Sequence, residues 1–83
     1  MTPQARIARK SAEWMRLDAL EIHRRMADLH ARAAEFFTNH AMLDRIGGRE
    51  ELAIEMEARA ERERDLEVVE RQLAAGESIR SPR

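Results

Sequence analysis

Residues 3–46 read PQARIARKSAEWMRLDALEIHRRMADLHARAAEFFTNHAMLDRI, and their large apolar residues recur every seven positions. Seven residues make about two turns of an α-helix, so the recurring residues share one face of a single long helix. The large members of this series are Met15, Ile22, Leu29, Phe36 and Leu43. The seven-residue series begins at Ala8. Four positions after its members stand mostly small residues, namely Ala12, Ala19, Met26 and Ala33. Such alternation is typical of a coiled-coil-like helix that a partner helix approaches closely.

A second, narrower stripe runs along another side of the same helix. Leu17 and Leu20 lie nearly opposite the large-residue series, and Ala27, Ala31 and Ala34 continue their side as a row of small residues. A helix with two apolar stripes can contact two neighbours at once. The sequence therefore predicts that residues 3–46 pack on more than one side.

Helix-end signals bound this first helix. Thr2 is a typical N-cap, and Pro3 at the first helical position lacks an N–H that would have no partner there. Gly47 and Gly48 end the helix, because one of them can adopt the left-handed conformation. Residues 38–39, Thr-Asn, are poor helix formers, so a break there is an open alternative to the continuous helix that we expect.

A second helix is expected from about residue 49 to residue 75. Glu50 and Glu51 suit its positive N-terminal end, and Gly76 is its C-terminal stop, with residues 77–83 as a flexible tail. Its apolar face is thin and consists of Leu52, Met56, Leu66, Val69 and Leu73. This helix needs the first one as a packing partner.

The double glycine predicts an antiparallel hairpin in which apolar residues of the two helices meet. The expected pairs are Leu43 with Leu52, Leu29 with Leu66, Met26 with Val69, and Ile22 with Leu73. Met56 falls beside Asn39 and His40, and Phe36 falls opposite Arg59. The predicted fold is thus all-α: one domain, residues 1–76, formed by a helical hairpin with a long first and a shorter second helix.

Chain length and helix lengths predict self-association. A core built from 83 residues without cysteine seldom provides more than about 3–5 kcal/mol of stability. At 1.5 Å per residue, the first helix extends roughly 25 Å past the second. This part contains large apolar residues that soluble monomers rarely expose together. We therefore expect a homodimer, a four-helix bundle with antiparallel first helices.

The sequence contains no recognisable catalytic or cofactor motif. It lacks a glycine-rich phosphate loop, and no nucleophile stands beside a base at a meaningful spacing. His23 and His30 are about 10.5 Å apart along the helix, which is too far for one shared metal ion, whereas His40 can reach Asp44. We expect a protein that is not an enzyme and has no metal or cofactor.

The hypothesis that remains is a protein-protein interaction module: a small adaptor, chaperone or inhibitor. Its predicted contact residues lie in the N-terminal third and are Ile7, Trp14, Met15, Leu17 and Leu20. Whether Trp14 faces a dimer partner or another protein is left open. The alternative is a nucleic-acid-associated regulator that uses the basic residues Arg6, Arg9, Lys10 and Arg16, although 15 basic against 16 acidic residues do not favour it.

Hydropathy predicts a cytoplasmic protein without a membrane segment. No run approaches the roughly 18 apolar residues of a membrane span, and the N-terminus lacks the apolar core of a signal peptide.

Overall fold

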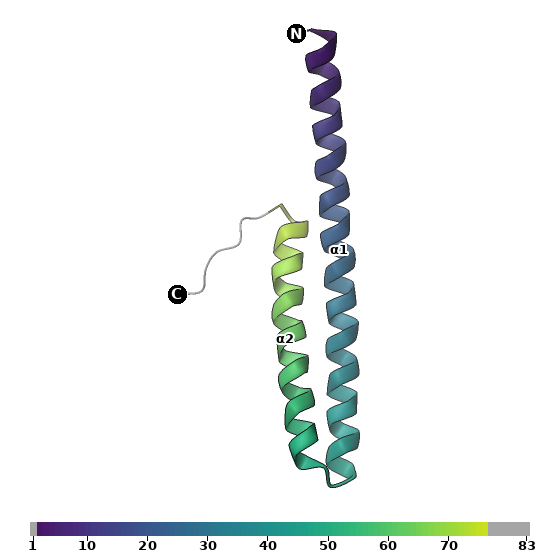
Figure 1. Ribbon diagram of the computed structural model, residues 1–83, viewed down its shortest axis with the longest axis vertical. Coiled ribbons are helices and arrows are strands. Elements are labelled where there is room, and N and C mark those ends of the chain that lie inside the picture. Colours follow the sequence, from purple (N-terminus) through teal and green to yellow (C-terminus); the bar gives the residue numbers. More distant parts are fainter. Residues whose placement is uncertain (1, 77–83) are drawn as a thin grey trace, which may run out of the picture.

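The computed structural model describes residues 2–76, which form two antiparallel helices joined by a short turn (Figure 1). Helix α1 spans Pro3–Ile46 and helix α2 spans Glu50–Ala74, and the described residues contain no strand. The predicted all-α helical hairpin is therefore confirmed. The bounds of α1 are those predicted, and α2 is shorter than predicted by one residue at each end. The predicted tail, 77–83, lies outside the described residues.

The N-terminal cap and the middle of α1 follow from local hydrogen bonds. The Thr2 hydroxyl accepts a hydrogen bond from the Ala5 N–H at 3.1 Å, as expected of an N-cap. Thr38 does not break the helix, because its hydroxyl donates to the Ala34 carbonyl one turn earlier at 2.9 Å. Of the two alternatives at residues 38–39, the continuous helix is the one found.

The turn between the helices depends on one left-handed glycine and one buried aspartate. Gly48 adopts φ +78°, whereas Gly47 keeps a negative φ of −79°. The Asp44 carbonyl accepts from the Arg49 N–H at 2.7 Å, and the Asp44 carboxylate accepts from the Arg49 side chain at 3.0 Å. These paired contacts hold the start of α2 against the last turn of α1.

Small residues form the hairpin core. Ala27, Ala34 and Ala41 of α1 and Ala53 and Ala60 of α2 are all buried, and within each helix they are spaced by seven. Alanines at this spacing let two helix backbones approach to the near end of the usual 8–10 Å range. The core is therefore the narrow stripe of α1, matched by a similar stripe on α2.

The large-residue series of α1 does not face α2, which corrects the predicted hairpin contacts. Ile22, Met26, Leu29, Phe36 and Leu43 are all exposed, and on α2 Leu52 and Leu66 are exposed while Met56, Val69 and Leu73 are half-buried. The close approach of the alanine stripes explains the difference, since large side chains between the helices would hold them apart. A role of these residues in a dimer stays a prediction.

The register also differs from the predicted one. His23 and His30 contact Glu70 and Glu63 of α2, whereas the predicted pairing places them opposite Gln72 and Asp65. Leu29 and Leu66 are 56% and 46% exposed, so they lie beside the interface and not within it.

Candidate protein-interaction surface

Helix α1 projects well beyond the end of α2. It has 44 residues against 25 in α2, and in Figure 1 the C-terminal end of α2 lies beside the middle of α1. Residues 3–19, called the overhang below, are all exposed, and burial begins only at Leu20. The first turns of α1 therefore have no packing partner within the described part of the chain.

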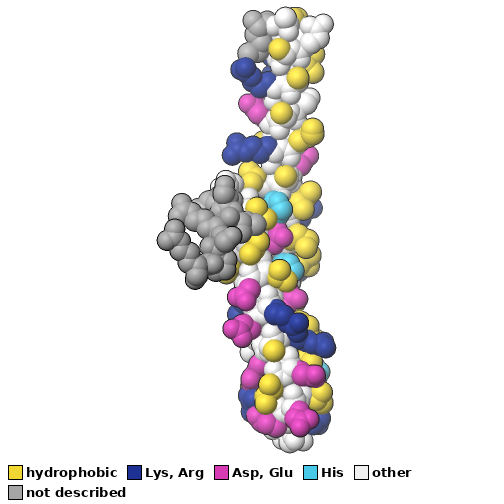
Figure 2. Space-filling view, turned by 60° about the vertical axis from the view of Figure 1, so that its left-hand side comes forward, with side chains coloured by type: hydrophobic (Ala, Val, Ile, Leu, Met, Phe, Trp, Pro, Cys, Tyr) yellow, Lys and Arg dark blue, Asp and Glu magenta, His cyan; other side chains and the backbone are white. Residues whose placement is uncertain are grey.

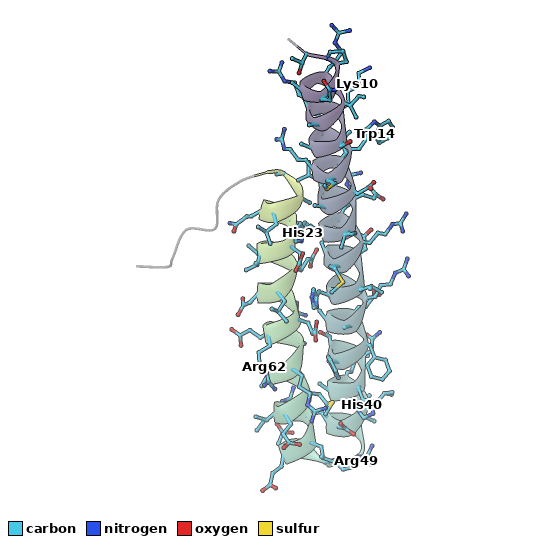
Figure 3. The ribbon with its side chains drawn as sticks, turned by 45° about the horizontal axis from the view of Figure 1, so that its top comes forward. Lys10, Trp14, His23, His40, Arg49 and Arg62 are labelled. Carbon is cyan, nitrogen blue, oxygen red and sulfur yellow. The ribbon has the colours of Figure 1, made fainter. Side chains whose placement is uncertain are left out.

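Four of the five predicted contact residues lie on the overhang. Ile7, Trp14, Met15 and Leu17 are all exposed, with Trp14 at 68% of its full surface, whereas Leu20 is half-buried near the end of α2. Figure 3 shows the Trp14 side chain on the side of α1 away from α2. The hairpin therefore leaves the N-terminal third of the chain as an uncovered apolar surface.

A second exposed apolar surface continues along the whole of α1, and Figure 2 shows hydrophobic side chains in a row from the overhang toward the turn. The helical repeat places the large members of this row about 160° around α1 from the alanine stripe and Met26 about 100° from it, and it turns Leu52 and Leu66 of α2 toward the same side of the hairpin. We call this surface the apolar face. It consists of Met15, Ile22, Met26, Leu29, Phe36 and Leu43 of α1 and Leu52 and Leu66 of α2.

The opposite side of the hairpin carries hydrogen bonds between the helices. Arg45 donates to Glu57, and this contact lowers the pKa of the Glu57 carboxyl. Farther along, Arg64 donates to the Thr38 hydroxyl at 2.7 Å, and Arg71 reaches Asp28 of α1. The hairpin is thus a two-helix layer in which one side carries these polar links together with the exposed Met42, Ile54 and Val68, and the other side carries the apolar face.

Two histidine–glutamate pairs lie between the helices. His23 Nδ1 is 2.6 Å from a carboxylate oxygen of Glu70, and His30 makes the same contact with Glu63 (Figure 3 shows His23). All four side chains are partly buried. Sequence reasoning missed these pairs, yet a signal was present: the seven-residue spacing of the histidines on α1 is repeated by the glutamates on α2.

The third histidine lies at the turn end, where the predicted His40 to Asp44 contact is confirmed at 3.0 Å. Asp44 also accepts from Arg49, and its side chain is only 4% exposed. The Arg49 hydrogen bond, aided by His40, holds the pKa of the Asp44 carboxyl below its usual value, although burial opposes this shift. Residues 2–76 contain no group of three side chains suited to hold a metal ion.

The basic residues of the alternative hypothesis, Arg6, Arg9, Lys10 and Arg16, are all exposed on the overhang. The Arg16 guanidinium lies 3.5 Å from where a Cβ of Gly76 would stand. It is therefore beside the C-terminal end of α2, where the helix dipole favours positive charge.

The chain matches no family model, and no match is found among curated proteins or solved structures. Within the described residues, neither helix has the length and apolar character needed to span a membrane.

Proposed function

We propose that the protein is a non-enzymatic interaction module, a small adaptor, chaperone or inhibitor that occupies a surface of another protein. The observation that carries this proposal is the overhang, where Ile7, Trp14 and Leu17 are exposed on a helix that α2 does not reach. Tryptophan is among the residues that most often dominate interface energies, because it buries a large rigid surface.

The spacing of these residues supports a helix-in-groove mode of binding. Leu17 follows Trp14 by three residues, and Trp14 follows Ile7 by seven, so the three side chains can enter one apolar groove as successive anchors. The surrounding basic residues would complement an acidic rim on the partner. We infer that the partner offers an apolar groove bordered by carboxylates.

Affinity capture from the native cell, with and without nuclease, tests the proposal. Replacing Trp14 with Ala should weaken capture of the bound protein by roughly 30-fold, the equivalent of a hot spot of about 2 kcal/mol. Met42→Ala is the matched control, because Met42 is also exposed on α1 but lies near the turn. Equal capture by both variants would contradict the proposed contact.

The same experiment separates the nucleic-acid alternative. Binding through phosphates would be lost on nuclease treatment, would weaken steeply with salt, and would depend on Arg6, Arg9 and Lys10. Capture that survives nuclease and depends on Trp14 supports a protein partner.

A further inference from the structure

We propose that the apolar face is covered by a second copy of the chain, with the two α1 helices antiparallel and each α2 lying beside the overhang of the other copy. The inference deepens the proposed function and rests on it, because it divides α1 into a self-pairing side and a side for another protein. Trp14 lies about 100° and Leu17 about 160° around the helix from Met15, where the row begins, so both side chains remain outside the interface of such a dimer.

The size of the apolar face is that of a stable interface. Leu29 and Phe36 expose 56% and 61% of their surfaces, and the other large α1 residues of the face, except Met26 at 38%, are similarly exposed. At about 100 Å² each, the six residues from α1 present roughly 600 Å² per chain, or about 1,200 Å² for two copies, which reaches the lower limit of specific interfaces. A monomer would leave a patch at the upper limit of those seen on soluble proteins.

The order of large and small residues favours antiparallel pairing. The face alternates the large series with a series that is alanine at residues 12, 19 and 33. Parallel helices would place equivalent residues together, with Phe36 against Phe36 and Ala19 against Ala19. Antiparallel helices instead place a member of one series against a member of the other. Large then meets small in most layers, and the spacing between the helices stays nearly constant along their length.

Helix lengths select the register. At 25 residues, α2 is slightly longer than half of the 44-residue α1. If the two α1 helices overlap along their full lengths, the two α2 helices together cover nearly the whole pair, one over each half. In this register Ala19 meets Leu29 of the second copy, and Ala12 meets its Phe36. Asp18 also falls beside Arg32 of the second copy, an opposite-charge pair next to the apolar row.

Charge complements this arrangement. The overhang carries four basic and two acidic residues, whereas α2 has nine acidic and four basic residues. In the antiparallel dimer each basic overhang lies along the acidic α2 of the second copy, which is attractive. A pairing that brought the two overhangs together would instead place like charges side by side.

Sedimentation tests self-pairing through this face. The unmodified chain should sediment as two copies at tens of micromolar, and Leu29→Glu should reduce it to one. The matched control is Met42→Glu, since Met42 is also 56% exposed on α1 but lies off the apolar face, and it should remain dimeric. Circular dichroism should show that both variants keep their helices. A monomeric unmodified chain, or a dimer unaffected by Leu29→Glu, overturns the inference.

Disulfide cross-linking tests direction and register, because the chain has no cysteine of its own. Ala19→Cys is mixed with a mass-tagged Leu29→Cys chain and oxidised gently. We expect disulfides between the two variants and none within either. Parallel pairing would link each variant to itself, and a register shifted by one heptad would link Ala19→Cys to Phe36→Cys instead. Either pattern overturns the arrangement.

The two proposals fail in distinguishable ways. Trp14→Ala should leave the dimer intact while weakening capture of another protein. A monomeric chain that still binds a partner through Trp14 would refute the dimer and leave the proposed function standing. A dimer with the expected cross-links, but with no partner that depends on Trp14, would support the self-pairing face and refute the proposed function.

Discussion

Replacing Ala34 with Leu should destabilise the hairpin, although the change adds apolar surface. Ala34 is 4% exposed, and the nearby stripe residue Ala60 of α2 is 1% exposed, so three additional carbon atoms have no space between the helices. Overpacking of this kind costs about 1–3 kcal/mol. That is a large part of the roughly 3–5 kcal/mol expected of so small a core. The melting temperature should fall by about 4–8 °C per kcal/mol.

The measurement is urea and thermal unfolding followed by helical circular dichroism. It is made in a Leu29→Glu background, so that self-association does not contribute. Ala58→Leu is the matched control, because Ala58 is exposed in the middle of α2 and leucine is a good helix former there. If Ala34→Leu is as stable as the control or more stable, the alanine stripe is not the hairpin interface. The large-residue series would then be the better candidate.

Further substitutions probe the turn and the polar contacts. Gly48→Ala should cost about 1–2 kcal/mol of unfolding free energy in urea, because Gly48 is left-handed. The pKa of Asp44 is lower in the folded than in the unfolded chain, so its contribution to stability is fully present above the unfolded pKa. This contribution is lost as the pH falls through the folded pKa, below about pH 4. In Asp44→Asn the urea midpoint should therefore fall less steeply as the pH is lowered. The double change Glu63→Gln and Glu70→Gln should speed amide exchange in α2, at a cost of up to about 1 kcal/mol per pair, and unchanged exchange would show that the histidine contacts contribute nothing.

Local signals predicted the elements of this fold well. Thr2 and Pro3 mark the start of α1 and the double glycine marks its end, because caps and left-handed turns require particular residues at particular positions. The lengths of the two helices then predicted the overhang, and with it the exposure of Ile7 and Trp14. These features depend on one segment of chain at a time, so pattern reasoning can reach them.

The face of α1 that meets α2 was not predicted, because it depends on both helices together. The row of Leu29 and Phe36 has the stronger hydrophobic pattern, yet the stripe of Ala27 and Ala34 makes the contact. The apolar area buried per residue favours contact through Leu29 and Phe36, whereas close approach of the backbones favours contact through Ala27 and Ala34. The deciding information lies in α2, where Ala53 and Ala60 repeat the alanine spacing.

A hairpin joined through alanines keeps its large side chains for other contacts. Among the described residues no large side chain is fully buried, so close helix packing and polar links such as His30 with Glu63 hold α1 and α2 together. The arginine links of Arg45, Arg64 and Arg71 lie on one side of the layer, whereas the histidine–glutamate pairs border the apolar row on the other. Because association of copies adds stability by mass action, a chain with so small an internal core gains most from covering that row. In the proposed dimer, folding and self-pairing are coupled, and the side of the overhang that bears Trp14 is the part of α1 proposed to serve a different protein.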